Sequence, residues 1–194
     1  MDRFSIYVTG VGGQGIGLLS EVLLRAGDHA GLIVKGVDTH GLAQRGGIVV
    51  SRLRFGASAH SPLIPRNGAD LAVSLERNEA LRAVDVGLKT GGDLIYYNTA
   101  WQPLAVRLGD AGAIDEAAVS EACQSRNIRE FRVFKADLAD VRMQNVAVLA
   151  HIDKNGLVPG VGTDHYRAAM TDLMAGKLLE KNLALFDEER NHAG

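Results

Sequence analysis

The sequence predicts an α/β protein, a three-layer αβα sandwich around a mixed, mostly parallel sheet with a Rossmann-like start. First, an apolar run at residues 4–9 leads directly into a glycine-rich turn at residues 10–15. Second, the amphipathic stretch 16–30 is followed by another apolar run, 32–37, which predicts a βαβ unit with parallel pairing of its two strands and a right-handed crossover. Third, side chains alternate at residues 48–55, which indicates a strand of a different kind.

The segment after the glycine turn has the periodicity of a helix. Its apolar residues recur at i, i+3, i+7 and i+10, which places them on one face: Ile16, Leu19, Leu23 and Ala26. Gly31 is expected to end this helix, because glycine readily adopts the conformation found just past helix ends.

Residues 48–55 are expected to depart from the parallel pattern. Leu53 and Phe55 alternate with Arg52 and Arg54, so one face of the strand is partly polar. The turn before this strand is too short for the crossover helix that parallel neighbours need. We therefore expect an antiparallel or edge strand, and hence a mixed sheet.

The rest of the chain alternates between apolar runs and amphipathic stretches. Further strands are expected at residues 70–75, 93–97 and 130–136. Helices are expected at residues 76–88, 115–126 and 145–152, and one long helix at residues 164–185. Gly91 and Gly92 are expected to close the helix that starts at residue 76. Since no linker or repeat interrupts the pattern, we expect one domain over residues 1–194, with a C-terminal helical segment from about residue 163.

Length and composition are those of an ordinary globular chain. Its 194 residues suffice to bury roughly 70% of the surface that the unfolded chain exposes. The net charge of −2 gives no footprint for nucleic acid. No apolar run is long enough to span a membrane, so we expect a cytoplasmic protein. The one cysteine, Cys123, excludes an internal disulfide, and it excludes an iron–sulfur cluster because a cluster needs about four thiolates.

The first glycine turn has the spacing of a dinucleotide-binding loop. Gly10, Gly12 and Gly15 follow the pattern G-x-G-x-x-G between a strand and a helix, where backbone N–H groups can approach an anion. Such sites also need an acidic residue about 20 residues further on, to hold the ribose. The nearest acid, Asp38, lies 28 residues after Gly10 and in the next turn. NAD binding is therefore disfavoured, and a turn that only packs a helix on a strand is the plainer alternative.

A second glycine turn, at residues 39–47, follows about one βα unit later. Arg45, beside two glycines, suits a phosphate or a partner's carboxylate, and it equally suits pinning the loop through backbone carbonyls. Asp38 and His40 have the spacing of an acid–base pair, although a turn-stabilising aspartate contact is the more usual role of such a residue.

No complete catalytic constellation is visible, so we predict no catalytic residue and no metal site in this chain. The other histidines are scattered without metal-ligand spacing. Cys123 is expected in the core, and no serine lies in a nucleophile-elbow context. Tyr96, Tyr97 and Trp101 form an aromatic cluster that fits the core or an interface better than base stacking.

The two turns together resemble a known family. Val-Gly-Gly-Gln-Gly at residues 11–15 and His-Gly-Leu-Ala-Gln-Arg-Gly-Gly at residues 40–47, followed by Val-Val-Ser at 49–51 and Arg54, look like the gamma-type subunit of 2-oxoacid:acceptor (ferredoxin) oxidoreductases. The branch that the chain resembles most is the beta subunit of indolepyruvate ferredoxin oxidoreductase. The resemblance continues through residues 70–71, 91–98, 145–149 and 182–186.

The resemblance implies a subunit that is inactive alone. Enzymes of this family oxidatively decarboxylate a 2-oxo acid, transfer the acyl group to coenzyme A and reduce ferredoxin. Thiamine diphosphate, Mg and iron–sulfur clusters are then expected on a larger partner subunit, and none of them on this chain. Residues expected at the subunit interface or at bound coenzyme A are those of the two turns: Gly12, Gly13, Gln14, Gly15, His40, Gln44, Arg45, Gly46 and Gly47.

Several alternatives stay open at this point. The chain could instead be the gamma subunit of a pyruvate or 2-oxoglutarate ferredoxin oxidoreductase, because the partner's pocket would select the oxo acid. A stand-alone NAD(P)- or flavin-dependent oxidoreductase and an adaptor domain without enzymatic partners are the other two. Two copies of the chain could also pair through the same turns. Residues 58–65 and the pair His151 and Ile152 depart from the family pattern, which bears on the substrate more than on the fold.

Overall fold

The computed structural model describes residues 1–40, 47–100 and 114–192, with side chains excepted at residues 39 and 40. In these ranges one six-stranded sheet has the strand order β2-β3-β1-β4-β5-β6. Its strands are β1 (Phe4–Val11), β2 (Val34–His40), β3 (Ile48–Phe55), β4 (Ala69–Ser74), β5 (Leu88–Tyr97) and β6 (Arg129–Val133).

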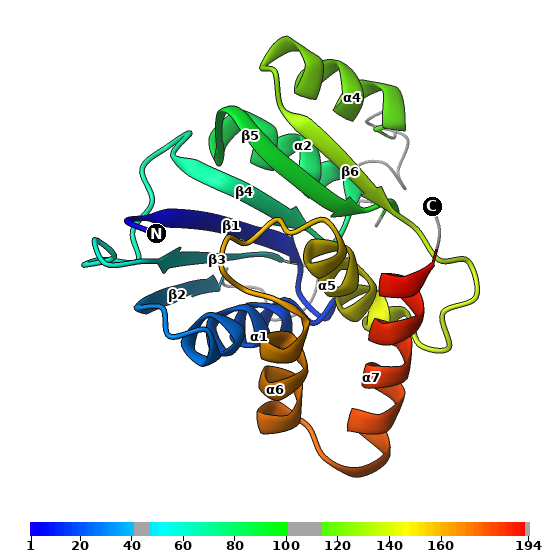
Figure 1. The fold of residues 1–194 in the computed structure, drawn as a ribbon. Helices are drawn as coiled ribbons and strands as arrows, with labels where there is room; N and C mark the ends of the chain where they lie inside the picture. Colours follow the sequence, from blue (N-terminus) through cyan, green and yellow to red (C-terminus); the bar gives the residue numbers. More distant parts are fainter. Residues whose placement is uncertain (41–46, 101–113, 193–194) are drawn as a thin grey trace.

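Helices cover both faces of this sheet. One face carries α1 (Ile16–His29), α5 (Gln144–Lys154), α6 (Thr163–Leu173) and α7 (Gly176–Asn191), and a short 3-10 helix, η1 (Val141–Met143), leads into α5. The other face carries α2 (Arg77–Val86) and α4 (Glu116–Ser125), as Figure 1 shows. The predicted three-layer αβα architecture is therefore confirmed.

Each face of the sheet has its own apolar core, because successive side chains of a strand point to opposite faces. On β1, Ile6 and Val8 belong to the larger core under α1, α5, α6 and α7. Tyr7, between them, belongs to the smaller core under α2 and α4. Burial of such side chains contributes about 1.5–3 kcal/mol each, so the sheet is held from both sides.

The expected change of strand direction occurs at β3. This strand pairs antiparallel with β1 on one side and with β2 on the other, whereas the pairs β1–β4, β4–β5 and β5–β6 are parallel. Its alternation is also as expected: Leu53 and Phe55 are buried, and Arg52 and Arg54 are only half-buried. The antiparallel prediction is confirmed, and β3 is an interior strand of a mixed sheet. The predicted parallel pairing of β1 with β2 is wrong, because β3 lies between them.

Two expectations about helices are wrong. Residues 164–185 form two helices, because Met174 and Ala175 are extended and Gly176 has a positive φ of 55°. The break lets α6 pack on α1 and α7 pack on α5. The helix that was expected to end at Gly91 and Gly92 ends earlier, with Gly87 as its C-cap. The two glycines lie within β5, where the pairing with β4 shifts register.

The sheet topology defines one edge where a site is favoured. The carboxyl ends of β1 and β4 are neighbours, and the helices that follow them, α1 and α2, leave toward opposite faces. In open α/β sheets a crevice forms at such a reversal of connection. The glycine turn after β1 lies at this point.

Candidate functional site

The turn between β1 and α1 is shaped by glycine. Gly13 and Gly15 have positive φ values of 103° and 81°, which side chains rarely adopt. Gly15 is also the N-cap of α1, where no side chain caps the helix and no acidic residue lies in the first turn. Nothing lies within 4 Å of the position that a Cβ of Gly13 would occupy, and Gly13 is exposed. The turn therefore presents backbone, not side chains, at its tip.

Gln14 holds this turn onto the neighbouring strand. Its side chain is 1% exposed; its Oε1 accepts from the N–H of Val11 at 2.7 Å, and its Nε2 donates to the carbonyl oxygen of Leu75 at 3.2 Å. Leu75 follows β4 directly, so Gln14 links the ends of the two strands at the point of reversal. The predicted site residue Gln14 consequently faces the interior, and its amide positions the turn.

The two glycine turns meet. The backbone N–H of Gly12 donates to the carbonyl oxygen of Gly47 at 2.9 Å, so the end of the second turn lies against the first. The backbone of His40 pairs with Val49 in the hairpin formed by β2 and β3. The side chain of His40 and the whole of Gln44, Arg45 and Gly46 lie outside the described residues.

Asn145 also contacts the turn, and it was not among the residues expected there. Its Nδ2 donates to the carbonyl oxygen of Gly15 at 3.2 Å, and its Oδ1 accepts from the N–H of Val146 at 2.8 Å. Asn145 lies in the first turn of α5, so this side chain joins the start of α5 to the start of α1. A polar pair, Gln144 and Asn145, opening an otherwise apolar helix is the sequence signal that could have indicated it.

Two buried carboxylates lie beside the turn, after β4. Glu76 caps α2 by accepting from the N–H groups of Asn78 and Glu79, and burial raises the pKa of the Glu76 carboxyl. Glu79 accepts from the hydroxyl of Thr9 at 2.9 Å and from Arg82 at 3.2 Å. Glu76 is therefore engaged in capping α2, and Glu79 in holding α2 onto β1.

The other described side chains with reactive groups, Cys123, Tyr96 and Tyr97, are buried or hydrogen-bonded within the fold. Burial raises the pKa of the Cys123 thiol to about 11, which makes it a poor nucleophile and ligand. Tyr96 donates to Glu130 and Tyr97 donates to the carbonyl oxygen of Lys135, both at 2.9 Å, and Trp101 lies outside the described residues. Within residues 1–40, 47–100 and 114–192, no group of three or more His, Cys, Asp or Glu is arranged to hold a metal ion. None of the helices described there is long and apolar enough to cross a membrane.

Comparison with known proteins identifies the family. The model of the pyruvate ferredoxin/flavodoxin oxidoreductase family matches residues 5–191. The chain belongs to this family. Among its curated relatives, the indolepyruvate oxidoreductase subunit IorB of Archaeoglobus fulgidus is 33% identical over 98% of this chain and 96% of its own length. The IorB subunit of Pyrococcus horikoshii is 29% identical over 96% and 94% of the two chains.

Solved structures of the oxidoreductase family share the fold. The gamma subunit of a keto/oxoacid ferredoxin oxidoreductase from Geobacter sulfurreducens has a TM-score of 0.66 at 17% identity, covering 96% of both chains. The 2-oxoglutarate:ferredoxin oxidoreductase of Magnetococcus marinus has a TM-score of 0.69 at 18% identity; 98% of this chain matches 31% of that one. The same fold thus occurs as a separate subunit and as part of a longer chain.

Proposed function

We propose that this chain is the small subunit of an indolepyruvate:ferredoxin oxidoreductase and carries no redox cofactor of its own. The observation that carries the proposal is the similarity to the two IorB subunits over nearly the full length of both chains. In the complex, an aryl pyruvate would be oxidatively decarboxylated to an acyl-coenzyme A, with coenzyme A as co-substrate and ferredoxin as electron acceptor.

The chemistry of the chain's own residues supports placing the redox groups elsewhere. An iron–sulfur cluster needs about four thiolates, and this chain has one cysteine, buried and with a raised thiol pKa. The sequence also lacks the Gly-Asp-Gly…Asn pattern with which thiamine enzymes hold magnesium and diphosphate. Thiamine diphosphate, Mg and the clusters would therefore belong to a larger partner subunit.

What this chain would supply is a docking surface at the carboxyl edge of its sheet. Exposed backbone at Gly13, close to the junction of Gly12 and Gly47, offers N–H groups without side chains in the way. Gln14 and Asn145 hold that backbone from below. Such a rigid, open turn suits close approach by the partner subunit or by the diphosphate of coenzyme A.

Reconstitution tests this proposal. The purified chain, the purified larger subunit and their mixture would each be assayed for ferredoxin reduction with coenzyme A and, in turn, indolepyruvate, pyruvate or 2-oxoglutarate. Only the mixture should reduce ferredoxin, and indolepyruvate should give the highest kcat/KM. Turnover by the isolated chain, or a preference for pyruvate or 2-oxoglutarate, would overturn the proposal in its role or its substrate, respectively. Fluorescence titration of the isolated chain should show no saturable binding of NADH or flavin.

A further inference from the structure

One half of the sheet has a face that α2 does not cover. On β3, Leu53 and Phe55 point into the core beneath α1, so the alternate residues of β3 and their cross-strand partners on β2 point to the other face. On that face α2 packs on β1, β4 and β5. The side chains that the structure describes on β2 and β3 at this face are exposed or half-buried, and we call them the open sheet face: Lys35, Val37, Ile48, Val50, Arg52 and Arg54.

The open sheet face is cationic at one end and apolar at the other. Lys35 stands directly opposite Arg54 in the β2–β3 register, and Arg52 is the next residue of β3 on the same face. Like charges directly opposite each other destabilise a strand pair, so this arrangement is unfavourable in the isolated chain. It becomes favourable when a carboxylate lies between the two cations.

Two carboxylates near the open sheet face have partners outside it. Glu79 is bound to Thr9 and Arg82, and Asp85 pairs with Arg66. A hollow of about 190 Å³ adjoins the face, lined in part by Tyr7, Arg52 and Arg66, and the guanidinium of Arg52 lies 5.8 Å from the centroid of the Tyr7 ring. Arginine and tyrosine are the residue types that most often dominate binding energy at interfaces.

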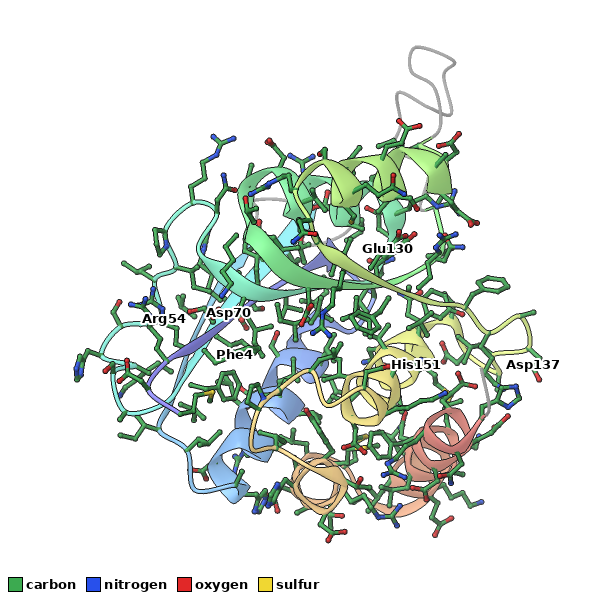
Figure 2. The ribbon with its side chains drawn as sticks, turned by 45° about the horizontal axis from the view of Figure 1, so that its top comes forward. Phe4, Arg54, Asp70, Glu130, Asp137 and His151 are labelled. Carbon is green, nitrogen blue, oxygen red and sulfur yellow. The ribbon has the colours of Figure 1, made fainter. Side chains whose placement is uncertain are left out.

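The position of the face connects it with the glycine turns. Ile48, at one end of the face, follows Gly47, whose carbonyl oxygen accepts from Gly12. Arg54, toward the other end, lies on the opposite side of the molecule from Asp137 and His151 (Figure 2). A partner seated on the turns can thus extend along β3 without a break.

The chemistry selects one kind of occupant. The chain as a whole has a net charge of −2, but the open sheet face is locally positive. A second copy docked face to face would place three cations against three others, which is unfavourable. Apolar side chains beside the cations favour a protein surface over a free anion. Resting on the function proposed above, we propose that the open sheet face is a docking surface for a carboxylate-bearing segment of the larger subunit.

Reversing the charge of Lys35 separates docking from folding. Lys35→Glu puts a carboxylate opposite Arg54, so the isolated chain should unfold at an equal or higher urea concentration than the wild type. The same change repels the partner's carboxylate, so the Kd for the purified larger subunit should rise at least about tenfold. The Kd of the wild type should also rise with salt, and that dependence should be weaker in the variant. Lys177→Glu, an exposed charge reversal on α7 across the sheet, is the matched control and should leave the Kd within about twofold.

Each other outcome contradicts the inference in its own way. If the wild type does not bind the larger subunit at all, the proposed function fails, and the docking surface fails with it. If the wild type binds and Lys35→Glu binds equally well, the complex stands and only the open sheet face is excluded. The docking surface would also be overturned if Lys177→Glu weakened binding of the larger subunit as much as Lys35→Glu does, or if Lys35→Glu lowered the stability of the isolated chain. Two further results would overturn it: self-association of the wild type that Lys35→Glu abolishes, and binding of a DNA duplex in place of the larger subunit.

Discussion

The backbone N–H of Gly12 donates to the carbonyl oxygen of Gly47 at 2.9 Å, which joins two glycine turns that are far apart in the sequence. Gly12 follows β1 and Gly47 precedes β3, so the bond extends the pairing of these two strands by one step beyond Val11 and Ile48. Whatever approaches this edge meets the two turns as one surface.

Gly15 is predicted to be the least replaceable glycine of the first turn. A Cβ there would lie 2.6 Å from Nδ2 of Asn145, and the positive φ of 81° is itself unfavourable. We expect Gly15→Ala to lower the free energy of unfolding by about 2–4 kcal/mol, from left-handed strain together with the clash. Urea unfolding followed by circular dichroism measures this.

Gly17 provides the control for Gly15, because it lies in the same helix turn with open space around it. Gly17→Ala should leave stability unchanged or raise it by up to about 1 kcal/mol, as expected for alanine in a helix. If Gly15→Ala and Gly17→Ala lowered the free energy of unfolding equally, the close approach of Asn145 to Gly15 would not be what makes Gly15 hard to replace.

Gln14 is predicted to contribute to stability through both ends of its amide. Gln14→Leu replaces the amide by an apolar side chain of similar size. It leaves the N–H of Val11 and the carbonyl of Leu75 without their partner. Each buried unpaired group costs about 1–3 kcal/mol, so a loss of about 2–4 kcal/mol is expected in the same urea measurement. Gln124→Leu, at an exposed position of α4, should change stability by no more than about 0.5 kcal/mol. A Gln14→Leu protein as stable as the wild type would contradict the bridging role.

His151 is predicted to make the protein less stable in mild acid. Burial lowers the pKa of the His151 imidazole from its ordinary 6.5, and the nearby Glu189 only partly offsets this. Below pH 6.5 the unfolded chain therefore binds the proton more readily than the folded one, so the free energy of unfolding falls as the pH falls. His151→Gln should lose less stability than the wild type between neutral and mildly acidic pH, measured as urea midpoints over that range. If His151→Gln lost as much stability as the wild type on acidification, or more, the expected destabilising effect of His151 at low pH would be contradicted.

Local patterns in the sequence predict most of the fold. The alternation of Leu53 and Phe55 with Arg52 and Arg54 indicates a strand with one polar face, and the short turn before it excludes a crossover helix. Both signals lie within a few residues of each other, and the antiparallel strand is found as expected.

The break between α6 and α7 was not predictable in the same way. The apolar stripe at helical spacing continues through Met174, and a lone glycine such as Gly176 is often tolerated within a helix. Packing decides the break: α6 lies against α1 and α7 against α5, and no local pattern specifies those contacts.

The candidate site is likewise predictable only in part. The meeting of the two turns follows from strand directions, because β1 and β2 run the same way and their carboxyl ends share an edge. The contacts of Gln14 with Leu75 and of Asn145 with Gly15 join residues 61 and 130 positions apart. Such contacts depend on the complete fold, so sequence alone assigned Gln14 to a ligand or partner instead of to the interior.

The most direct test of the account is the affinity of the chain for the larger subunit after substitution at Gly13. Gly13→Val and Gly31→Val are matched, because both glycines have positive φ values, 103° and 73°, and open space where a Cβ would lie. Gly31, however, lies between α1 and β2, away from the two turns. Both variants should lose similar stability, and only Gly13→Val should raise the Kd by at least about tenfold, measured by titration calorimetry. Equal affinities in the two variants would contradict the claim that the joined glycine turns are where the partner docks.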